Sequence, residues 1–185
     1  MTISGFSFVR NAVKLYYPIR EAIESILPIC DEFVVAVGRG DPDDTTRDEI
    51  ASINDPKVKI IDTVWDQRYC KRGAIHAQQT DLAKSECSCY WCFYLQGDEV
   101  VHEDDHENIV ARCEELVDDE RVEGLLFDYL HFWGDYDHYH TGHGWYPHEM
   151  RIVRNDPSID SWDSSESVRR FDFYEDTHQK EGTHK

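Results

Sequence analysis

The residues best suited to chemistry lie directly after an apolar run in the middle of the chain. Residues 90–95 (YWCFYL) are followed by Gln96, Gly97, Asp98 and Glu99. Hard divalent cations such as Mg²⁺ and Mn²⁺ prefer carboxylate oxygens of this kind, and Gly97 lets the backbone come close to a ligand. Because Asp98 alone leaves most of a cation's coordination sphere open, we expect a substrate diphosphate to supply the other ligands. A helix cap or a solvated turn is the alternative interpretation of these two carboxylates.

Polar and basic residues follow two other apolar runs. Arg10 and Asn11 come after residues 3–9, and the turn-rich residues 38–44 come after residues 33–37. In open α/β sheets, ligands bind beyond the carboxyl ends of the strands, at the point where the strand order reverses. These residues and the 96–99 segment are therefore expected at one edge of a sheet, although a single arginine is more often a surface charge than a ligand contact.

The pattern of apolar residues predicts the elements that position these groups. Residues 33–37 (FVVAV) form a continuous apolar run, which is typical of a parallel strand covered on both faces. Residues 19–27 carry apolar side chains at the i, i+3, i+4, i+7 spacing of one buried helix face. Thr46 and Glu49 have the spacing of a capping box at the start of a further helix. Strands are expected at residues 3–9, 33–37, 58–64, 90–95, 122–132 and 149–154, and helices at 18–27, 46–53, 73–84 and 103–117.

This alternation predicts the α/β fold class, with a Rossmann-like open sheet, mostly parallel and flanked by helices. Residues 134–147 are expected to form a loop. From residue 164 onward almost nothing apolar recurs, so we expect one domain over residues 1–163 and a polar C-terminal tail over 164–185.

Overall charge limits the classes of partner. The chain has 185 residues, with 19 basic and 38 acidic side chains, for a formal net charge of −19. This argues against a nucleic-acid-binding protein and against docking on anionic lipid. The sequence shows no signal-peptide pattern and no apolar run of transmembrane length, so a cytoplasmic protein with free cysteine thiols is expected.

A zinc site is the other chemistry that the composition suggests. Cys87, Cys89 and Cys92 straddle the start of a predicted strand, where alternation sends the side chains to different faces. The histidines of residues 138–148 fall in a polar loop. This spacing is poor for zinc, and packed thiols and loop histidines are the favoured interpretation.

The sequence resembles a known family, the bacterial inverting glycosyltransferases of family two, which have the GT-A fold. The resemblance covers most of the chain, through the segments SGFSFVRN, DEFVVAVG, WCFYLQGDEVV and RIVRN. Its most specific part is the strand that commonly ends in LDADE in the family, where an Asp-x-Asp motif binds metal and nucleotide diphosphate. Asp98 matches the second aspartate of this motif, and Gln96 replaces the first. A glutamine at this position can hydrogen-bond a ribose or diphosphate, but it supplies no charge.

The resemblance implies a role for particular residues. Glu149 is the implied general base, with Asp135 and Asp137 as alternatives. A simple exposed position at the start of an edge strand is nearly as good an interpretation of Glu149. Trp133 and Trp145 are implied to stack on an acceptor sugar. The metal ligand would be Asp98. The donor would be bound by Arg10, Asn11, Arg39, Asp41, Arg72, Gln96, Gly97, Asp98 and Arg151.

The implied activity is transfer of a sugar, with inversion, from a UDP- or GDP-linked donor to a saccharide or lipid-linked acceptor. Cell-surface polysaccharide or lipopolysaccharide synthesis is the expected setting, with Mg²⁺ or Mn²⁺ as cofactor. A nucleotidyltransferase would need a glycine-rich basic loop after the first strand, and residues 10–14 (RNAVK) have no glycine. A non-catalytic or truncated nucleotide-sugar-binding module of the same fold remains the alternative.

Overall fold

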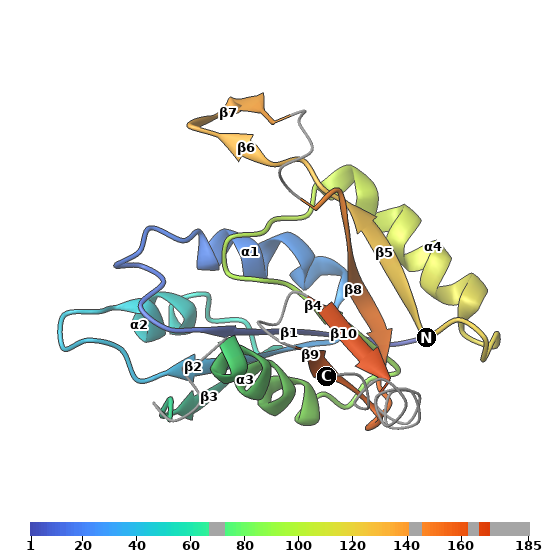
Figure 1. The fold of residues 1–185 in the computed structure, drawn as a ribbon, viewed down its shortest axis with the longest axis horizontal. Coiled ribbons are helices and arrows are strands. Elements are labelled where there is room, and N and C mark those ends of the chain that lie inside the picture. Colours follow the sequence, from blue (N-terminus) through green and yellow to red (C-terminus); the bar gives the residue numbers. More distant parts are fainter. Residues whose placement is uncertain (67–72, 141–145, 163–166, 171–185) are drawn as a thin grey trace, which may run out of the picture.

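The computed structural model describes residues 1–66, 73–140, 146–162 and 167–170. The described part forms an α/β fold (Figure 1). Its strands are β1 (Ile3–Val9), β2 (Glu32–Gly38), β3 (Val58–Thr63), β4 (Trp91–Tyr94), β5 (Gly124–Asp128), β6 (Phe132–Trp133), β7 (Asp135–Tyr139), β8 (His148–Arg154), β9 (Ile159–Trp162) and β10 (Ser167–Arg170). Its helices are α1 (Ile19–Ile26), α2 (Thr46–Ala51), α3 (Ala74–Ser85) and α4 (His106–Leu116), with short 3-10 turns at Leu27–Ile29 and Glu103–Asp105.

A six-stranded sheet organises the fold, in the order β3-β2-β1-β4-β8-β5. β1 pairs in parallel with both β2 and β4, and β2 pairs in parallel with β3. β8 runs antiparallel to β4 and to β5. The expected fold class, an open and mostly parallel sheet flanked by helices, is confirmed. The strand order reverses at β1, because β2 and β3 are added on one side of it and β4 on the other. Since these strands are parallel, the carboxyl ends of β1, β2 and β4 lie at one edge.

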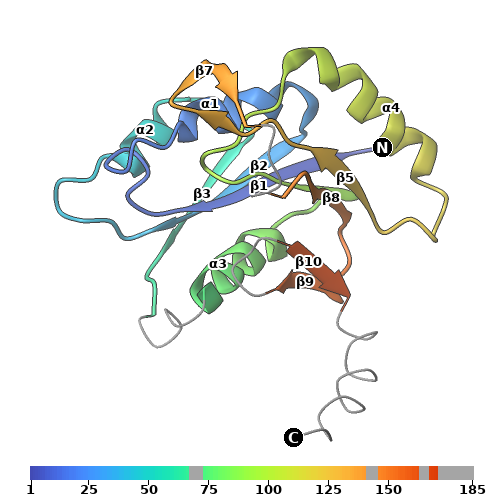
Figure 2. The ribbon, with the colours of Figure 1, turned by 45° about the horizontal axis from the view of Figure 1, so that its top comes forward.

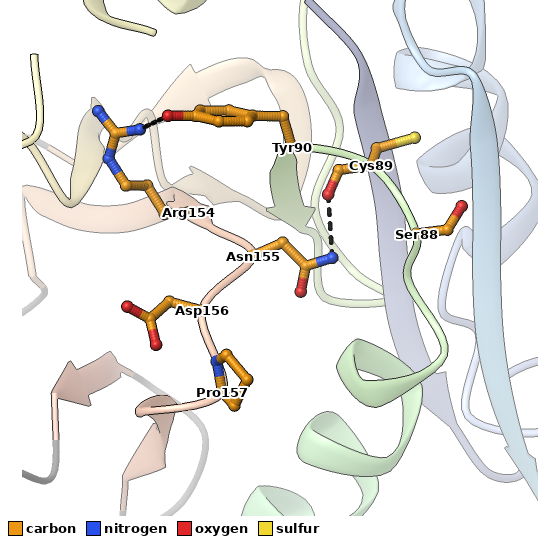
Figure 3. Close-up of a pocket in the computed structure, with 7 residues that line it drawn as sticks. All are labelled: Ser88, Cys89, Tyr90, Arg154, Asn155, Asp156 and Pro157. Carbon is orange, nitrogen blue, oxygen red and sulfur yellow. Dashed lines mark hydrogen bonds between the residues drawn. The ribbon is translucent and has the colours of Figure 1, made fainter. Parts of the chain in front are cut away.

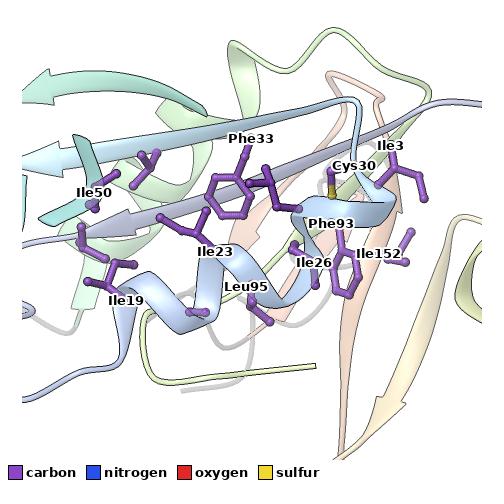
Figure 4. Close-up of a cluster of buried hydrophobic side chains, with 14 of the residues drawn as sticks. Ile3, Ile19, Ile23, Ile26, Cys30, Phe33, Ile50, Phe93, Leu95 and Ile152 are labelled. Carbon is purple, nitrogen blue, oxygen red and sulfur yellow. The ribbon is translucent and has the colours of Figure 1, made fainter. Parts of the chain in front are cut away.

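Helices cover both faces of this sheet, as Figure 2 shows, with α1, α2 and α4 on one face and α3 with β9 and β10 on the other. Alternate residues of the strands feed two separate cores. Phe33 joins the α1 side, with Ile23 and Ile26 (Figure 4), while Val34 joins the α3 side. Every residue of β2 is buried, which explains why its sequence is a continuous apolar run rather than an alternating one.

Three expectations from the sequence are wrong in detail. The strand expected over residues 122–132 ends at Asp128, and the residues expected to form a loop after it include an antiparallel hairpin of β6 and β7. Thr46 forms no capping box, because its buried hydroxyl accepts a hydrogen bond from the Val13 amide and donates one to Asp44. Within the segment predicted as a polar tail, residues 167–170 form β10, which pairs with β9.

The remaining elements form close to their expected positions, and the five described cysteines are free thiols as expected, with Cys70 outside the described residues. No helix in the described ranges is both long and apolar enough to cross a membrane.

Arg154, at the end of β8, joins the sheet to α4. α4 has no basic residue in its last turn, so its final carbonyls need donors from elsewhere. The Arg154 guanidinium, which lies over the rings of Tyr90 and Trp91, supplies them. It donates hydrogen bonds to the carbonyl oxygens of Leu116, Val117, Asp119 and Val122.

Glu32 holds together the opposite edge of the sheet, where β1, β2 and β4 begin. Its carboxylate accepts hydrogen bonds from the Ser4 hydroxyl at 2.6 Å and from the Ser88 amide at 2.6 Å, and it pairs with Lys59. Burial alone would raise the pKa of Glu32, but the bonds from Lys59, Ser4 and Ser88 outweigh it and lower the pKa to about 2. The ionised carboxylate is therefore the form that the fold requires.

We expect Glu32→Gln to lower the free energy of unfolding at pH 7 by about 1–3 kcal/mol, because the donors around it lose a charged acceptor. A lowered pKa stabilises the fold above the ordinary value of 4.5, and this contribution disappears as the pH falls toward about 2. The difference between wild type and variant should shrink over that range in urea titrations. Asp62→Asn, at the exposed pair with Arg47, is the control and should change stability by less than about 1 kcal/mol. A constant difference from pH 7 to pH 3 would contradict this account of Glu32.

Candidate functional site

The residues expected to bind a ligand gather at the carboxyl edge of β1, β2 and β4. Arg10 and Asn11 follow β1, Arg39 and Asp41 follow β2, and the Gln96–Glu99 segment follows β4. The loops after β1 and β2 are joined directly, since the Arg10 side chain donates to the Arg39 carbonyl oxygen at 3.0 Å. The Asp41 amide donates to the Asn11 side chain at 2.8 Å.

The charges in these two loops are already partly paired. Asp41 forms ion pairs with Lys14 at 2.9 Å and with Arg10 at 3.8 Å. The hydrogen bond from Lys14 and that from Asn11 hold the pKa of Asp41 below its ordinary value, so Asp41 is ionised. Asn11 adopts a left-handed backbone conformation (φ 57°), which short polar side chains such as asparagine tolerate. The loops thus present three basic side chains, Arg10, Lys14 and Arg39, among several carboxylates.

Trp65, which follows β3, is a part of this edge that sequence reasoning missed. Its indole lies against the end of β2, so close that a Cβ added to Gly38 would be 2.3 Å from the indole nitrogen. The Arg10 guanidinium lies 5.6 Å from the Trp65 ring centre, and His76 makes an edge contact at 5.6 Å. Only a glycine at position 38 permits this contact, and that pairing of glycine with a distant tryptophan has no local sequence signal.

The turn after β4 carries Asp98 to the solvent-exposed side of the same edge. Gly97 packs against the end of β1, where an added Cβ would lie 3.1 Å from Val9 Cγ1. Its role here is close packing of the turn on the sheet, which places Asp98 beside the β1 loop. Desolvation by the surrounding protein raises the pKa of Asp98, and the neighbouring charge of Glu99 raises it further. Both effects oppose ionisation of Asp98, and a cation bound beside it would act in the opposite direction.

Glu99 turns inward and forms a bidentate ion pair with Arg151 of β8. The Arg151 Nη2 and Nε atoms donate to the two Glu99 carboxylate oxygens at 2.7 and 3.0 Å. The side chains are 2% and 10% exposed, respectively, so this pair is internal. The Arg151 guanidinium lies 5.3 Å from each of the ring centres of Tyr94 and Tyr129. Arg151 was predicted to contact the donor diphosphate; in this structure its guanidinium is committed to Glu99.

Aromatic side chains adjoin this ion pair. The Tyr129 hydroxyl donates to Glu99 at 2.9 Å, and the Tyr129 ring stacks on His131 with centres 5.6 Å apart. Tyr146 packs edge-on against both rings. Burial raises the pKa of Tyr146, and so do nearby carboxylates, which are those of Glu99, Asp98 and Glu149. Tyr146 is therefore within electrostatic reach of both Asp98 and Glu149.

Glu149, the predicted general base, is half-buried near the start of β8, opposite Phe127 of β5. The alternatives, Asp135 and Asp137, lie on the exposed hairpin of β6 and β7. A hydrogen bond with His138 at 2.6 Å lowers the pKa of Asp135. The structure therefore separates the candidates by environment: Glu149 is half-buried and its charge acts on Tyr146, whereas the two aspartates are exposed on the hairpin.

The hairpin of β6 and β7 projects from the body of the fold above β5 and β8 (Figure 1). It forms a two-stranded sheet of its own, and all of its residues are exposed. Trp133, predicted to contact an acceptor, is 69% exposed there. The other exposed aromatic side chains of the hairpin are Phe132, Tyr136 and Tyr139.

A divalent cation would have Asp98 as its carboxylate ligand at this edge. Within the part of the chain that the structure describes, no group of three or more His, Cys, Asp or Glu side chains is arranged to hold a metal ion. The exposed Asp98 carboxylate and the adjacent Gln96 fit a cation that takes most of its ligands from a substrate. Two further predicted residues, Arg72 and Trp145, lie outside the described residues.

A pocket at the opposite edge of the sheet is unrelated to this site. It is open, has a volume of about 550 Å³, and lies at the start of β4 and the end of β8 (Figure 3). Arg154 and Asn155 line it, but their side chains are engaged with the Tyr90 hydroxyl and with the carbonyl oxygens of Cys87 and Cys89. The pocket therefore offers few uncommitted polar groups, and the candidate site remains the carboxyl edge.

Comparison of the sequence with known protein families and with curated proteins found no match. Among solved structures, S. aureus TarS 1–349 in complex with UDP is similar over 62% of this chain and 32% of that one, with 18% identity and a TM-score of 0.46. Glucosyl-3-phosphoglycerate synthase from Mycobacterium tuberculosis, in complex with UDP, is 14% identical over 71% of this chain and 45% of that one, with a TM-score of 0.46.

A third similar structure is 4-diphosphocytidyl-2C-methyl-D-erythritol synthase. It is 10% identical over 83% of this chain and 75% of that one, with a TM-score of 0.49. The matched region spans about a third of TarS 1–349. At these identities the comparisons assign neither a family nor a function to the chain.

We expect Gly38→Ala to displace the Trp65 indole, because the added methyl group overlaps it, and to cost about 1–3 kcal/mol of stability. The displacement should change the near-ultraviolet circular dichroism of the indole, measured beside urea unfolding. Gly97→Ala is the comparison, since its added Cβ meets Val9 only at 3.1 Å and leaves Trp65 in place. Unchanged near-ultraviolet spectra in Gly38→Ala would refute the contact.

Proposed function

We propose that the protein is an inverting glycosyltransferase that binds a nucleotide-diphosphate sugar at the carboxyl edge of β1, β2 and β4. The single observation that carries this proposal is the convergence of three loops there. Arg10 and Asn11 from the first loop are bonded to Arg39 and Asp41 of the second, and the Asp98 turn packs on the end of β1. This is the switch point at which open α/β sheets bind nucleotides.

In this proposal the loops after β1 and β2 bind the base and ribose, and the Asp98 turn binds the diphosphate. Asp98 holds Mg²⁺ or Mn²⁺, which would neutralise the diphosphate charge in a protein whose net charge is −19. Gln96 supplies a neutral hydrogen-bonding group where the resembled family has a carboxylate. Arg39 and Arg72 are the basic side chains that we assign to the donor.

Inversion requires one general base on the face of the sugar opposite the leaving group. We assign that role to Glu149, because it is half-buried near the start of β8 and its charge reaches Tyr146, as that of Asp98 does, whereas Asp135 and Asp137 are exposed. The exposed aromatic side chains of the hairpin, with Trp133 among them, would stack on the apolar faces of a saccharide or lipid-linked acceptor. Surface-polysaccharide assembly is the setting that we propose.

We expect calorimetric titration of UDP or GDP into the protein to show Mn²⁺-dependent binding of one diphosphate, with CMP as the negative control. Asp98→Ala should weaken that binding at least tenfold, because the cation loses its protein carboxylate. Asp104→Ala is the matched control: its carboxylate is 89% exposed on a 3-10 turn and should leave affinity unchanged. If neither diphosphate binds the folded wild type, the transferase proposal fails and a non-catalytic module, favoured by Gln96, becomes the better account.

For the general base, Glu149→Gln should lower the rate of sugar transfer by about 10²–10⁴-fold while nucleotide affinity stays within twofold. The measurement is release of nucleotide from donor sugars in the presence of saccharide acceptors. Asp135→Asn provides the comparison and should retain most of the rate. The reverse ranking of the two variants would move the base to the hairpin.

A further inference from the structure

The ion pair between Glu99 and Arg151 has a feature that ordinary structural ion pairs lack: one partner belongs to the ligand turn itself. Glu99 immediately follows Asp98, and its carboxylate accepts a hydrogen bond from the backbone amide of Gln96 at 2.9 Å. The Glu99 amide in turn donates to the Gln96 carbonyl oxygen at 3.1 Å. The side chain therefore closes the turn on which Gly97 and Asp98 lie, and Arg151 holds that side chain in place.

Arg151 is itself placed by an irregularity in the sheet. In the pairing of β5 with β8, Leu125 lies opposite Ile152 and its neighbour Leu126 lies opposite Met150. Arg151 is the extra residue between them, so it occupies a β-bulge. Bulges re-aim a side chain relative to the regular alternation of a strand and are over-represented beside active sites. Here the bulge coincides with a guanidinium that lies against the rings of Tyr94 and Tyr129.

Stability alone does not account for such a pair. Removing two charges from water costs about as much as their attraction returns, and buried pairs can often be replaced by apolar side chains without loss. What the pair does provide is a fixed geometry, because a bidentate contact defines both distance and angle. It joins the turn after β4 to β8 at a position two residues from Glu149.

We infer that Glu99 and Arg151 are positioning residues, which fix the Gln96–Asp98 turn relative to the start of β8. This inference rests on the proposed function, since it gives the pair the task of setting the diphosphate-binding carboxylate against the general base. Neither residue contacts the donor in this scheme. Both act through the backbone of the turn and through Tyr129, whose hydroxyl bonds to Glu99.

The experiment uses Glu99→Gln, Arg151→Met and the double variant that carries both changes. Each single variant leaves a buried charge without its partner, so its urea midpoint should fall. The double variant has no unpaired charge, so its midpoint should return toward that of wild type. Three quantities are measured for each protein: the urea midpoint, the hydrogen-exchange rate of the amides of residues 96–99, and the Mn²⁺-dependent affinity for UDP and GDP.

For a positioning pair, the double variant regains stability but not function. Its amides at residues 96–99 should exchange at least tenfold faster than in wild type, and its affinity for the nucleotide should stay at least tenfold weaker. Glu32→Gln is the matched control, because it removes the charge of a buried carboxylate that is paired and hydrogen-bonded at the opposite edge. It should lower the midpoint while leaving both the exchange of residues 96–99 and the nucleotide affinity as in wild type.

Two results would overturn the inference. One is a double variant with wild-type exchange at residues 96–99, which means that the turn keeps its shape without the pair. The other is recovery of nucleotide affinity together with stability, which assigns the pair to stability alone. If the wild type binds neither diphosphate, the proposed function fails, and the exchange rates still decide whether the pair holds the turn.

Discussion

The hydrogen bonding of β1 on both of its edges is the constraint on which the rest of the structure depends. β1 is the strand at which the chain changes direction across the sheet, with β2 on one side and β4 on the other. The loops after β2 and β4 therefore lie on either side of its carboxyl end, where the Arg39 carbonyl oxygen accepts a hydrogen bond from Arg10 and Gly97 packs against Val9. Its two faces also divide the apolar residues between two separate cores, so α1 and α3 lie against opposite faces of the sheet.

Two ion pairs with enclosed carboxylates serve the two edges of the sheet differently. At the amino edge, Glu32 collects donors from three chain segments, those of Ser4, Lys59 and Ser88, and closes the ends of β1, β2 and β4. At the carboxyl edge, Glu99 and Arg151 form a more enclosed pair, with aromatic rings around the guanidinium. The first arrangement seals the sheet where no ligand is expected. The second leaves Asp98 beside it open to solvent, which suits an edge that must receive a charged substrate.

What the sequence could predict is set by how local the signal is. Apolar runs such as FVVAV and the helical spacing of residues 19–27 report burial directly, and these elements appear where expected. The hairpin of β6 and β7 was not predicted, because all residues of both strands are exposed and the sequence carries no pattern of apolar residues that face a core. Thr46 resembled a cap, but its hydroxyl is used by Val13, a residue 33 positions away.

The same distinction between local and long-range signals applies to the residues of the candidate site. Asp98, Arg10 and Asn11 follow recognisable strands, so their common edge could be inferred from topology. The indole of Trp65 over Gly38 and the bond between Glu99 and Arg151 join residues that are distant in sequence, and no spacing rule indicates them. Arg151 in particular is recognisable as an internal side chain only once the bulge in β8 is known.

The strand order also bears on how the chain is made. β8 lies between β4 and β5 in the sheet, although both of them precede it in the sequence. On a ribosome, β4 and β5 therefore emerge with a vacant slot between them, and the hydrogen-bonding edges that face this slot have no partner from the sheet until residues 148–154 arrive. Exposed strand edges invite pairing with other chains. The nascent protein is thus most vulnerable to aggregation in the interval between the synthesis of β5 and that of β8, when Arg154 has also not yet reached the end of α4.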